Sequence, residues 1–362
     1  MEVVHGARRR ENMPRKRIKN QADTDSAVRR IGLIADAEEL GGYAGLLKRA
    51  SGLRVAACAG FPRDLTPEHA TWYDDQRVLL AQGDIDGVVV ATSPRRAVGV
   101  GAIALEQGVD LWRRPPLGRN FAEAVEVARR LRTAQSGYRL ASWWEQVEQP
   151  IRALWNAAID TKVNLISEIW ISAVGPDRAS WCSTLVEAGG GVLIQNGYAA
   201  LEALCALRGL PESVFGWIGT CRGGAAGTPR ETEDAAAALL RYSEGGSAVL
   251  RATWDVPPYQ IRAAHYGSGG EVRHDVASAT RYDVRGEEVE SRALPQAHPE
   301  WELHRFVEMI DAPAEEQNSP RCIDRHLMVS AVLETLYLSA RTGQPEDPRR
   351  LFEVQKWPEP SC

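Results

Sequence analysis

The sequence of 362 residues is poor in closely spaced cysteines, in long apolar runs and in lysine. No apolar run approaches the roughly 20 residues needed to cross a bilayer, and the basic N-terminus lacks the apolar stretch of a secretory signal. We therefore expect a cytoplasmic protein without a membrane partner. The six cysteines contain no C-x-x-C pair, which argues against a disulfide framework and a thiolate metal site. We expect reduced, mostly buried thiols and no metal; the cysteines are 58, 182, 205, 221, 322 and 362.

Lysine is scarce, with five lysines against 38 arginines among the 43 basic residues. Arginine stays protonated at any ordinary pH. A tunable amine for proton transfer or Schiff-base formation would therefore have to come from those five lysines.

Four segments follow from composition and periodicity. Residues 1–27 form a basic, solvated tail, for which a nucleic-acid arm is the alternative; we assign it no function and expect no nucleic-acid partner. Residues 28–146 alternate short apolar runs with amphipathic stretches, which predicts a doubly wound parallel sheet of Rossmann type. The expected strands are 28–35, 53–59, 87–91 and 109–112, and the expected helices are 40–50, 74–82, 96–107 and 121–135.

Residues 147–348 read as an α+β domain, and residues 349–362 as a C-terminal tail. The segment from Val249 to Val256 alternates apolar and polar residues with the period of a sheet that has one covered face. A large, mostly antiparallel open sheet is expected, and a final helix can return to the first domain. The expected strands are 165–174, 213–220, 235–243, 246–256, 260–266 and 270–276, and the expected helices are 150–160, 299–311 and 323–342.

Five stretches resemble one family over residues 30–348. They are DIDGVVVATSP (84–94), LEQGVDLWRRPPLGRNFAEA (105–124), EAGGGVLIQNGYAALEAL (187–204), ETEDAAAALLRYSEGGSAVLRATW (231–254) and YLSARTGQP (337–345). The chain is similar to the Gfo/Idh/MocA family of glucose-fructose oxidoreductase and inositol dehydrogenase. The resemblance implies the fold above, NAD(P)-dependent oxidation of a sugar or polyol, and a homodimer or tetramer formed through the large sheet.

The family's cofactor turn is degenerate in this chain. The three glycine positions of its G-x-G-x-x-G turn hold Ala35, Ala37 and Leu40. The neighbouring Asp36, Glu38 and Glu39 place carboxylates where a pyrophosphate would lie, and we expect Asp36 and Glu39 to cap their own helix. Gly41 and Gly42 could instead shift the turn by a few residues.

The ribose position is altered as well. The family's acid at the end of the second strand is Gly60, while Thr92 and Pro94 are retained. Arg63 would favour NADP over NAD if any affinity survives. We expect no cofactor otherwise.

The catalytic positions have lost their ionisable groups. The lysine of the family's E-K-P motif is replaced by Pro115, and the Asp and His of its D-x-G-x-H segment by Gln195 and Ala199. Proton transfer typically contributes about 10²–10⁴ in rate, so ordinary dehydrogenase activity is not expected. We expect each of the seven histidines to be a surface or strand residue.

A pocket for a planar, anionic or sugar-like ligand is the remaining prediction for the cleft. Its candidate residues are Arg113, Arg114, Trp143, Trp144, Glu145, Glu168, Gln195 and Tyr198. The leading hypothesis is an oxidoreductase homologue that has lost its activity and serves as a binding, regulatory or scaffold protein. The alternative is an enzyme. It would be either an atypical NAD(P)-dependent oxidoreductase or a non-redox enzyme that uses Glu145, Glu168 or Tyr198.

Overall fold

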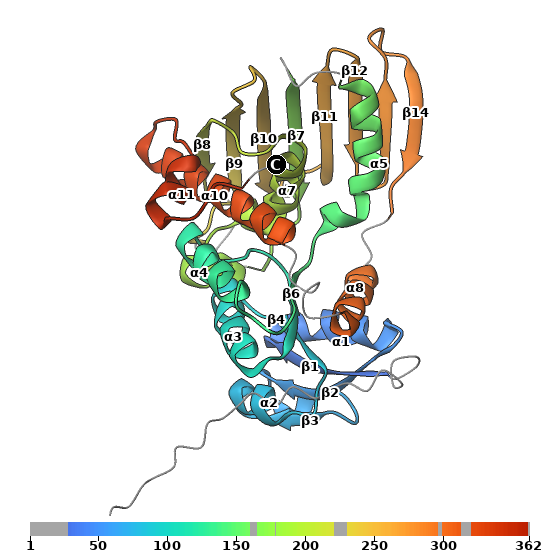
Figure 1. Ribbon diagram of the computed structural model, residues 1–362, viewed down its shortest axis with the longest axis vertical. Helices are drawn as coiled ribbons and strands as arrows, with labels where there is room; N and C mark the ends of the chain where they lie inside the picture. Colours follow the sequence, from blue (N-terminus) through green and yellow to red (C-terminus); the bar gives the residue numbers. More distant parts are fainter. Residues whose placement is uncertain are drawn as a thin grey trace, which may run out of the picture.

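Two sheets form the two ends of the molecule in the computed structural model (Figure 1). The structure describes residues 28–159, 165–177, 179–220, 230–295, 299–312 and 320–360. The basic tail expected at residues 1–27 lies outside the described residues. Within the described ranges, no helix combines the length and the apolar character needed to span a bilayer.

The N-terminal sheet has six parallel strands in the order β3-β2-β1-β4-β5-β6, which confirms the predicted doubly wound architecture. All five residues of β4 are buried, as expected of a central strand with helices on both faces. The elements are β1 (Arg29–Ala35), α1 (Ala37–Arg49), β2 (Leu53–Ala59), η1 (Arg63–Leu65), β3 (Thr71–Tyr73), α2 (Gln76–Gln82), β4 (Gly87–Ala91), α3 (Pro94–Gln107), β5 (Asp110–Arg113), α4 (Phe121–Leu131) and β6 (Tyr138–Leu140).

The C-terminal sheet has eight strands in the order β14-β13-β12-β11-β7-β10-β9-β8, and β7 with β10 is its one parallel pair among the described strands. This confirms the large, mostly antiparallel sheet. Its strands are β7 (Ile166–Ala173), β8 (Ser213–Gly219), β9 (Ala235–Arg241), β10 (Ser247–Trp254), β11 (Gln260–Gly267), β12 (Gly270–Asp275), β13 (Ser278–Tyr282) and β14 (Glu288–Ala293).

One face of the large sheet is covered by helices and the other is open. Figure 1 shows α5 (Trp143–Ala158), α7 (Tyr198–Arg208) and α10 (Pro320–Thr342) on the covered face. The alternation along β10 follows this division, with Leu250 and Ala252 fully buried and Val249 and Arg251 exposed. Between β7 and α7 lie η2 (Trp181–Ser183), α6 (Leu185–Ala188) and η3 (Leu193–Gly197).

The sequence predicts a strand end at residues 141–146 (ASWWEQ), but in the structure these residues follow β6 and begin α5. The Ser142 hydroxyl accepts a hydrogen bond from the backbone N–H of Glu145 at 3.2 Å. Ser-x-x-Glu before an apolar run is the pattern of a helix start. The tryptophans of this segment therefore lie on a helix.

Two later helices return to the N-terminal domain. Phe306 and Ile310 of α8 (Pro299–Asp311) are buried in one apolar cluster with Ile31 of β1. The rings of Phe121 and Phe352, the latter on α11 (Arg349–Gln355), lie 4.8 Å apart. The two domains therefore share apolar contacts beyond their connecting helix.

Candidate functional site

The turn between β1 and α1 contains no glycine. Gly41 and Gly42 lie inside α1, and a Cβ atom added at either would meet nothing within 4 Å. Both residues therefore belong to the helix and lie outside the turn, whose three family glycine positions hold Ala35, Ala37 and Leu40.

Asp36 does not cap its own helix, contrary to the expectation from sequence. Its Oδ2 accepts a hydrogen bond from the backbone N–H of Ser93 at 2.9 Å, and its Oδ1 pairs with the Arg96 guanidinium at 2.6 Å. Ser93 is the N-cap residue of α3, where a helix favours an anion. The carboxylate of the protein itself thus lies at the N-terminus of α3.

Arg96 covers the ribose position at the end of β2. Its Nη2 donates to Gln76 at 3.0 Å. Gly60 has a φ of 101°, and a Cβ atom there would lie 2.6 Å from both Nη2 of Arg96 and the Ala35 carbonyl oxygen. Glycine is required because a side chain would collide with both. Arg63, expected to meet a 2′-phosphate, is an exposed residue of η1.

The first turn of α1 carries two further carboxylates, and both bind protein groups. Glu39 pairs with Arg114 at 2.7 Å. Glu38 accepts a hydrogen bond from the backbone N–H of Trp181 at 3.3 Å. With Asp36, three carboxylates surround the position of a pyrophosphate, and the charge there is unfavourable for a second anion.

The C-terminal domain contacts this edge of the N-terminal sheet directly. Glu187 of α6 accepts a hydrogen bond from the Ser93 hydroxyl at 2.7 Å and pairs with Arg95 at 3.0 Å. The hydrogen bond from Ser93 is the main cause that lowers the pKa of Glu187. Arg119 donates to the carbonyl of Val186 at 2.6 Å. Retained Thr92 and Pro94 are buried beside these contacts.

Arg113 lies in the core and does not face the cleft. Its side chain is 1% exposed, and Nε donates to the Tyr138 hydroxyl at 2.5 Å. Nη1 and Nη2 donate to the carbonyls of Arg114, Pro116 and Leu117 at 3.1, 2.5 and 2.6 Å. Arg113 therefore fixes the loop after β5, which contains Pro115 at the former lysine position.

Arg114 is directed toward α1. Its guanidinium binds Glu39 and lies 5.7 Å from the centre of the Tyr43 ring. Burial is the main cause that raises the pKa of Tyr43 to about 12. Arg113 and Arg114, which were predicted to line one pocket, therefore lie in separate surroundings. The charge of Arg114 is compensated by the Glu39 carboxylate.

Gln195 lies in η3 and Ala199 in α7, so the altered D-x-G-x-H segment enters a helix. Tyr198, between them, is 2% exposed, and its hydroxyl hydrogen-bonds Nδ1 of His326 at 2.9 Å. Burial is the main cause that lowers the pKa of His326 to about 3. His326 lies inside α10, so the expectation of a surface or strand histidine is wrong for this residue.

The other candidate residues are dispersed. Trp144 is fully buried in the cluster beneath α5, and Trp143 lies beside the His274 ring at 6.3 Å. Glu145 pairs with Arg139 at 2.7 Å. Glu168 is exposed on the open face of the large sheet, so the structure does not bring Glu145, Glu168 and Tyr198 together as a catalytic set.

Sequence reasoning missed Arg96, Glu187 and Glu233. Glu233 accepts hydrogen bonds from the backbone N–H groups of Gly191 and Leu193 and from the Tyr337 hydroxyl. It fixes the turn before η3. Each of these three side chains forms its contacts with residues that lie at least 40 positions away or on another element. No local motif therefore indicates them.

No thiolate or metal centre emerges from the described part of the chain. Cys58, Cys182 and Cys205 are buried thiols, as expected. Burial is the main cause that raises the pKa of Cys182, near the cleft, to about 11, so its thiol is protonated at neutral pH. No group of three or more metal-binding side chains occurs among the described residues.

Comparison with known proteins gives one family and one fold. Residues 164–273 match the model of the GFO/IDH/MocA C-terminal domain. None of the curated proteins matches the chain in sequence. The structure is similar to an oxidoreductase domain protein from Kribbella flavida, with a TM-score of 0.73 and 20% identity over 89% of this chain and 99% of that one.

Two further solved structures were determined with NADH. Levoglucosan dehydrogenase with NADH and L-sorbose has a TM-score of 0.71 and 17% identity, over 88% of this chain and 98% of that one. The WlbA dehydrogenase from Bordetella pertussis with NADH and UDP-GlcNAcA has a TM-score of 0.70 and 17% identity, over 89% and 98%. The family model matches the large sheet, and the whole fold is that of these oxidoreductases. Residues 164–273 thus match the Gfo/Idh/MocA C-terminal domain, and the chain as a whole shares the fold of these oxidoreductases.

Proposed function

We propose that this oxidoreductase-like protein does not oxidise a sugar or polyol with NAD(P) and instead works as a binding or regulatory protein. The single observation that carries the proposal is the placement of Asp36. Its carboxylate accepts from Ser93 at the N-terminus of α3 and pairs with Arg96, which in turn covers Gly60. The residues at this edge of the sheet therefore do not fit a dinucleotide.

The catalytic positions support the same proposal. Pro115 and Ala199 have no group that can move a proton, and Gln195 can hydrogen-bond a hydroxyl but cannot titrate. The adjacent titratable groups, Tyr198 and His326, are buried and bonded to each other. Among the described residues of the cleft, these substitutions support the proposal that the protein lacks a cofactor cradle and an acid–base pair.

An atypical NAD(P)-dependent oxidoreductase is the rival function. It is favoured by the similarity to levoglucosan dehydrogenase and the WlbA dehydrogenase, both solved with NADH. Tight cofactor binding would require Asp36 to release Arg96 and the chain to rearrange around Gly60. Cofactor binding by the wild-type protein therefore distinguishes the two functions.

We expect no binding of NADH or NADPH to the wild-type protein. Calorimetry and melting curves should show neither heat nor a shift at micromolar cofactor, with levoglucosan dehydrogenase as the positive control. The variant Ala35→Gly/Ala37→Gly/Leu40→Gly should recover weak binding at most, because Arg96 still covers the ribose position and Asp36 still repels phosphate. Micromolar affinity in the wild type would overturn the proposed function.

We also propose that two copies pair through the open face of the large sheet. Phe215, Leu239 and Val249 stand opposite one another across β8, β9 and β10 and are 44%, 48% and 38% exposed. Beside this row, Trp217 is 57% exposed. A contiguous apolar surface of this kind on a soluble domain marks an interface, and a symmetric pair would bury the same row of each copy.

The proposed pairing predicts a dimer in solution. Light scattering should give about twice the monomer mass of 39.8 kDa at micromolar concentration. Leu239→Asp, at the centre of the row, should dissociate the dimer because it buries a charge in an apolar interface. Val284→Asp is the matched control, since Val284 is 74% exposed in the turn between β13 and β14. A wild-type mass near that of the monomer contradicts the pairing.

A further inference from the structure

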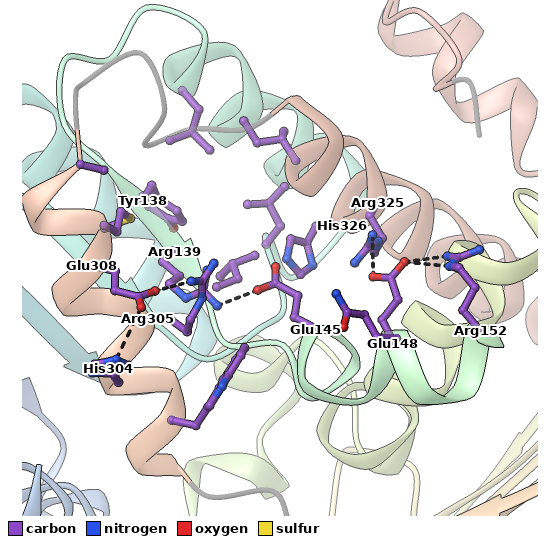
Figure 2. A pocket seen from close by; sticks show the side chains of 18 of the residues that line it. Tyr138, Arg139, Glu145, Glu148, Arg152, His304, Arg305, Glu308, Arg325 and His326 are labelled. Carbon is purple, nitrogen blue, oxygen red and sulfur yellow. Dashed lines mark hydrogen bonds and ion pairs between the residues drawn. The ribbon is translucent and has the colours of Figure 1, made fainter. Parts of the chain in front are cut away.

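A cavity of about 1140 Å³ lies apart from the cofactor edge, between β6, α5, α8 and α10. Figure 2 shows charged side chains from all four elements around it. Its lining includes Arg139, Glu145, Glu148, Arg152, Arg325 and His326. The volume is slightly above the usual range of about 300–1,000 Å³ for small-molecule sites.

The ion pairs on one wall do not balance. Glu148 is shared by two guanidinium groups, Arg152 at 2.7 Å and Arg325 at 3.4 Å. One carboxylate therefore compensates two positive charges. On the opposite wall, Arg139 pairs with two carboxylates, Glu145 at 2.7 Å and Glu302 at 3.5 Å. The positive surplus thus lies near Arg325.

Glu202 stands behind Arg325 and does not remove this surplus. The two side chains approach to 4.0 Å, and Glu202 is 2% exposed. Burial is the main cause that raises the pKa of Glu202 to about 8, so the carboxyl group is mostly protonated at neutral pH. Its Oε1 accepts a hydrogen bond from the Ser142 hydroxyl at 2.6 Å.

His326 adds an unused polar atom to the same wall. Its side chain is 2% exposed, and its Nε2 has no hydrogen-bond partner among the described residues. Leaving a buried polar atom without a partner costs about 1–3 kcal/mol. The Tyr198 hydroxyl is able to donate to Nδ1, and in that tautomer the neutral ring carries its proton on Nε2. Nε2 is then a donor that lacks an acceptor.

We propose that this cavity binds a small molecule that carries a carboxylate or phosphate group, with Arg325 and Nε2 of His326 as the donors to that group. The anion supplies the negative charge that Glu148 alone cannot provide and the acceptor that Nε2 lacks. A guanidinium binds either group through parallel hydrogen bonds. This site is separate from the cofactor edge, and its occupancy does not depend on the proposed function.

The test uses the full chain with three probes: malonate, inorganic phosphate and uncharged glycerol. Calorimetry and melting curves at millimolar probe should show binding of malonate or phosphate and none of glycerol. Binding of malonate alone identifies a carboxylate site, and binding of phosphate alone a phosphate site. If neither anion binds, the proposal is wrong.

Variants then locate the site. Arg325→Gln and His326→Gln should each weaken binding at least tenfold, which corresponds to about 1.4 kcal/mol. Arg325→Lys should retain part of the affinity, and it keeps the test valid if His326→Gln fails to fold. Arg130→Gln is the control, since Arg130 of α4 pairs at the surface with Glu106 of α3 and Glu126 of α4. This variant should bind the probes like wild type. Equal affinity in Arg325→Gln and wild type would overturn the assignment.

Discussion

Replacing Arg113 by alanine is expected to destabilise the protein by about 3–5 kcal/mol. The guanidinium is buried and donates to the Tyr138 hydroxyl and to three carbonyls of the loop after β5. Its removal leaves these acceptors without partners and opens a cavity, and each buried group left unsatisfied costs about 1–3 kcal/mol. This loss of stability should be measured as a large drop in the melting temperature.

Arg114→Ala is the matched comparison, one residue along the chain. Arg114 is 46% exposed and binds Glu39, so its loss should cost about 1 kcal/mol or less, as for other exposed ion pairs. A destabilisation by Arg114→Ala that equals that of Arg113→Ala would contradict the assignment of Arg113 to the core and return both residues to a shared pocket.

Replacing Glu202 by glutamine is expected to stabilise the protein increasingly as the pH rises from about 5 to 8. The pKa of Glu202 is raised to about 8 in the folded chain, chiefly by burial, against 4.5 for the free group. Between these values the folded state binds more protons than the unfolded state. The wild type therefore loses stability with rising pH, by up to about 1.4 kcal/mol per unit.

Glutamine removes this pH dependence and keeps an oxygen that accepts from the Ser142 hydroxyl. The difference in melting temperature between Glu202→Gln and wild type should thus be small at pH 5 and largest near pH 8. Glu353→Gln serves as the control, because Glu353 is an exposed residue of α11. A difference that stays constant with pH would show that Glu202 is already ionised in the folded protein.

The alternation of apolar runs and amphipathic stretches predicted both sheets because it reports burial directly. The predicted strands do not include β3 and β6, because three residues carry no period. They also do not include β13 and β14, whose residues are mostly exposed or half-buried and therefore lack an apolar alternation. The start of α5 was missed although Ser142 and Glu145 have the spacing of a capping pair. The apolar pair Trp143 and Trp144 favours a strand end, whereas the spacing of Ser142 and Glu145 indicates a helix start. The second signal is the one that the structure follows.

The candidate site could be predicted only at the positions that align with a motif. Sequence alone identified the loss of ionisable groups at Pro115, Gln195 and Ala199. It could not predict that Arg113 turns into the core, because the carbonyls that hold it belong to a loop whose path depends on packing. Glu202 and Arg325 approach each other across 123 positions of sequence, so no local pattern indicates the cavity beside them.

The contact of Asp36 with Arg96 also constrains how a dinucleotide site could form at this edge of the sheet. A first mutation that removes the carboxylate leaves Arg96 above Gly60 without the acid that binds it at 2.6 Å. A first mutation that removes Arg96 leaves Asp36 beside the helix terminus with a charge still opposed to phosphate. Either order passes through a less stable intermediate that gains no cofactor. The two residues are therefore coupled, and a dinucleotide site at this edge would require both positions to change together.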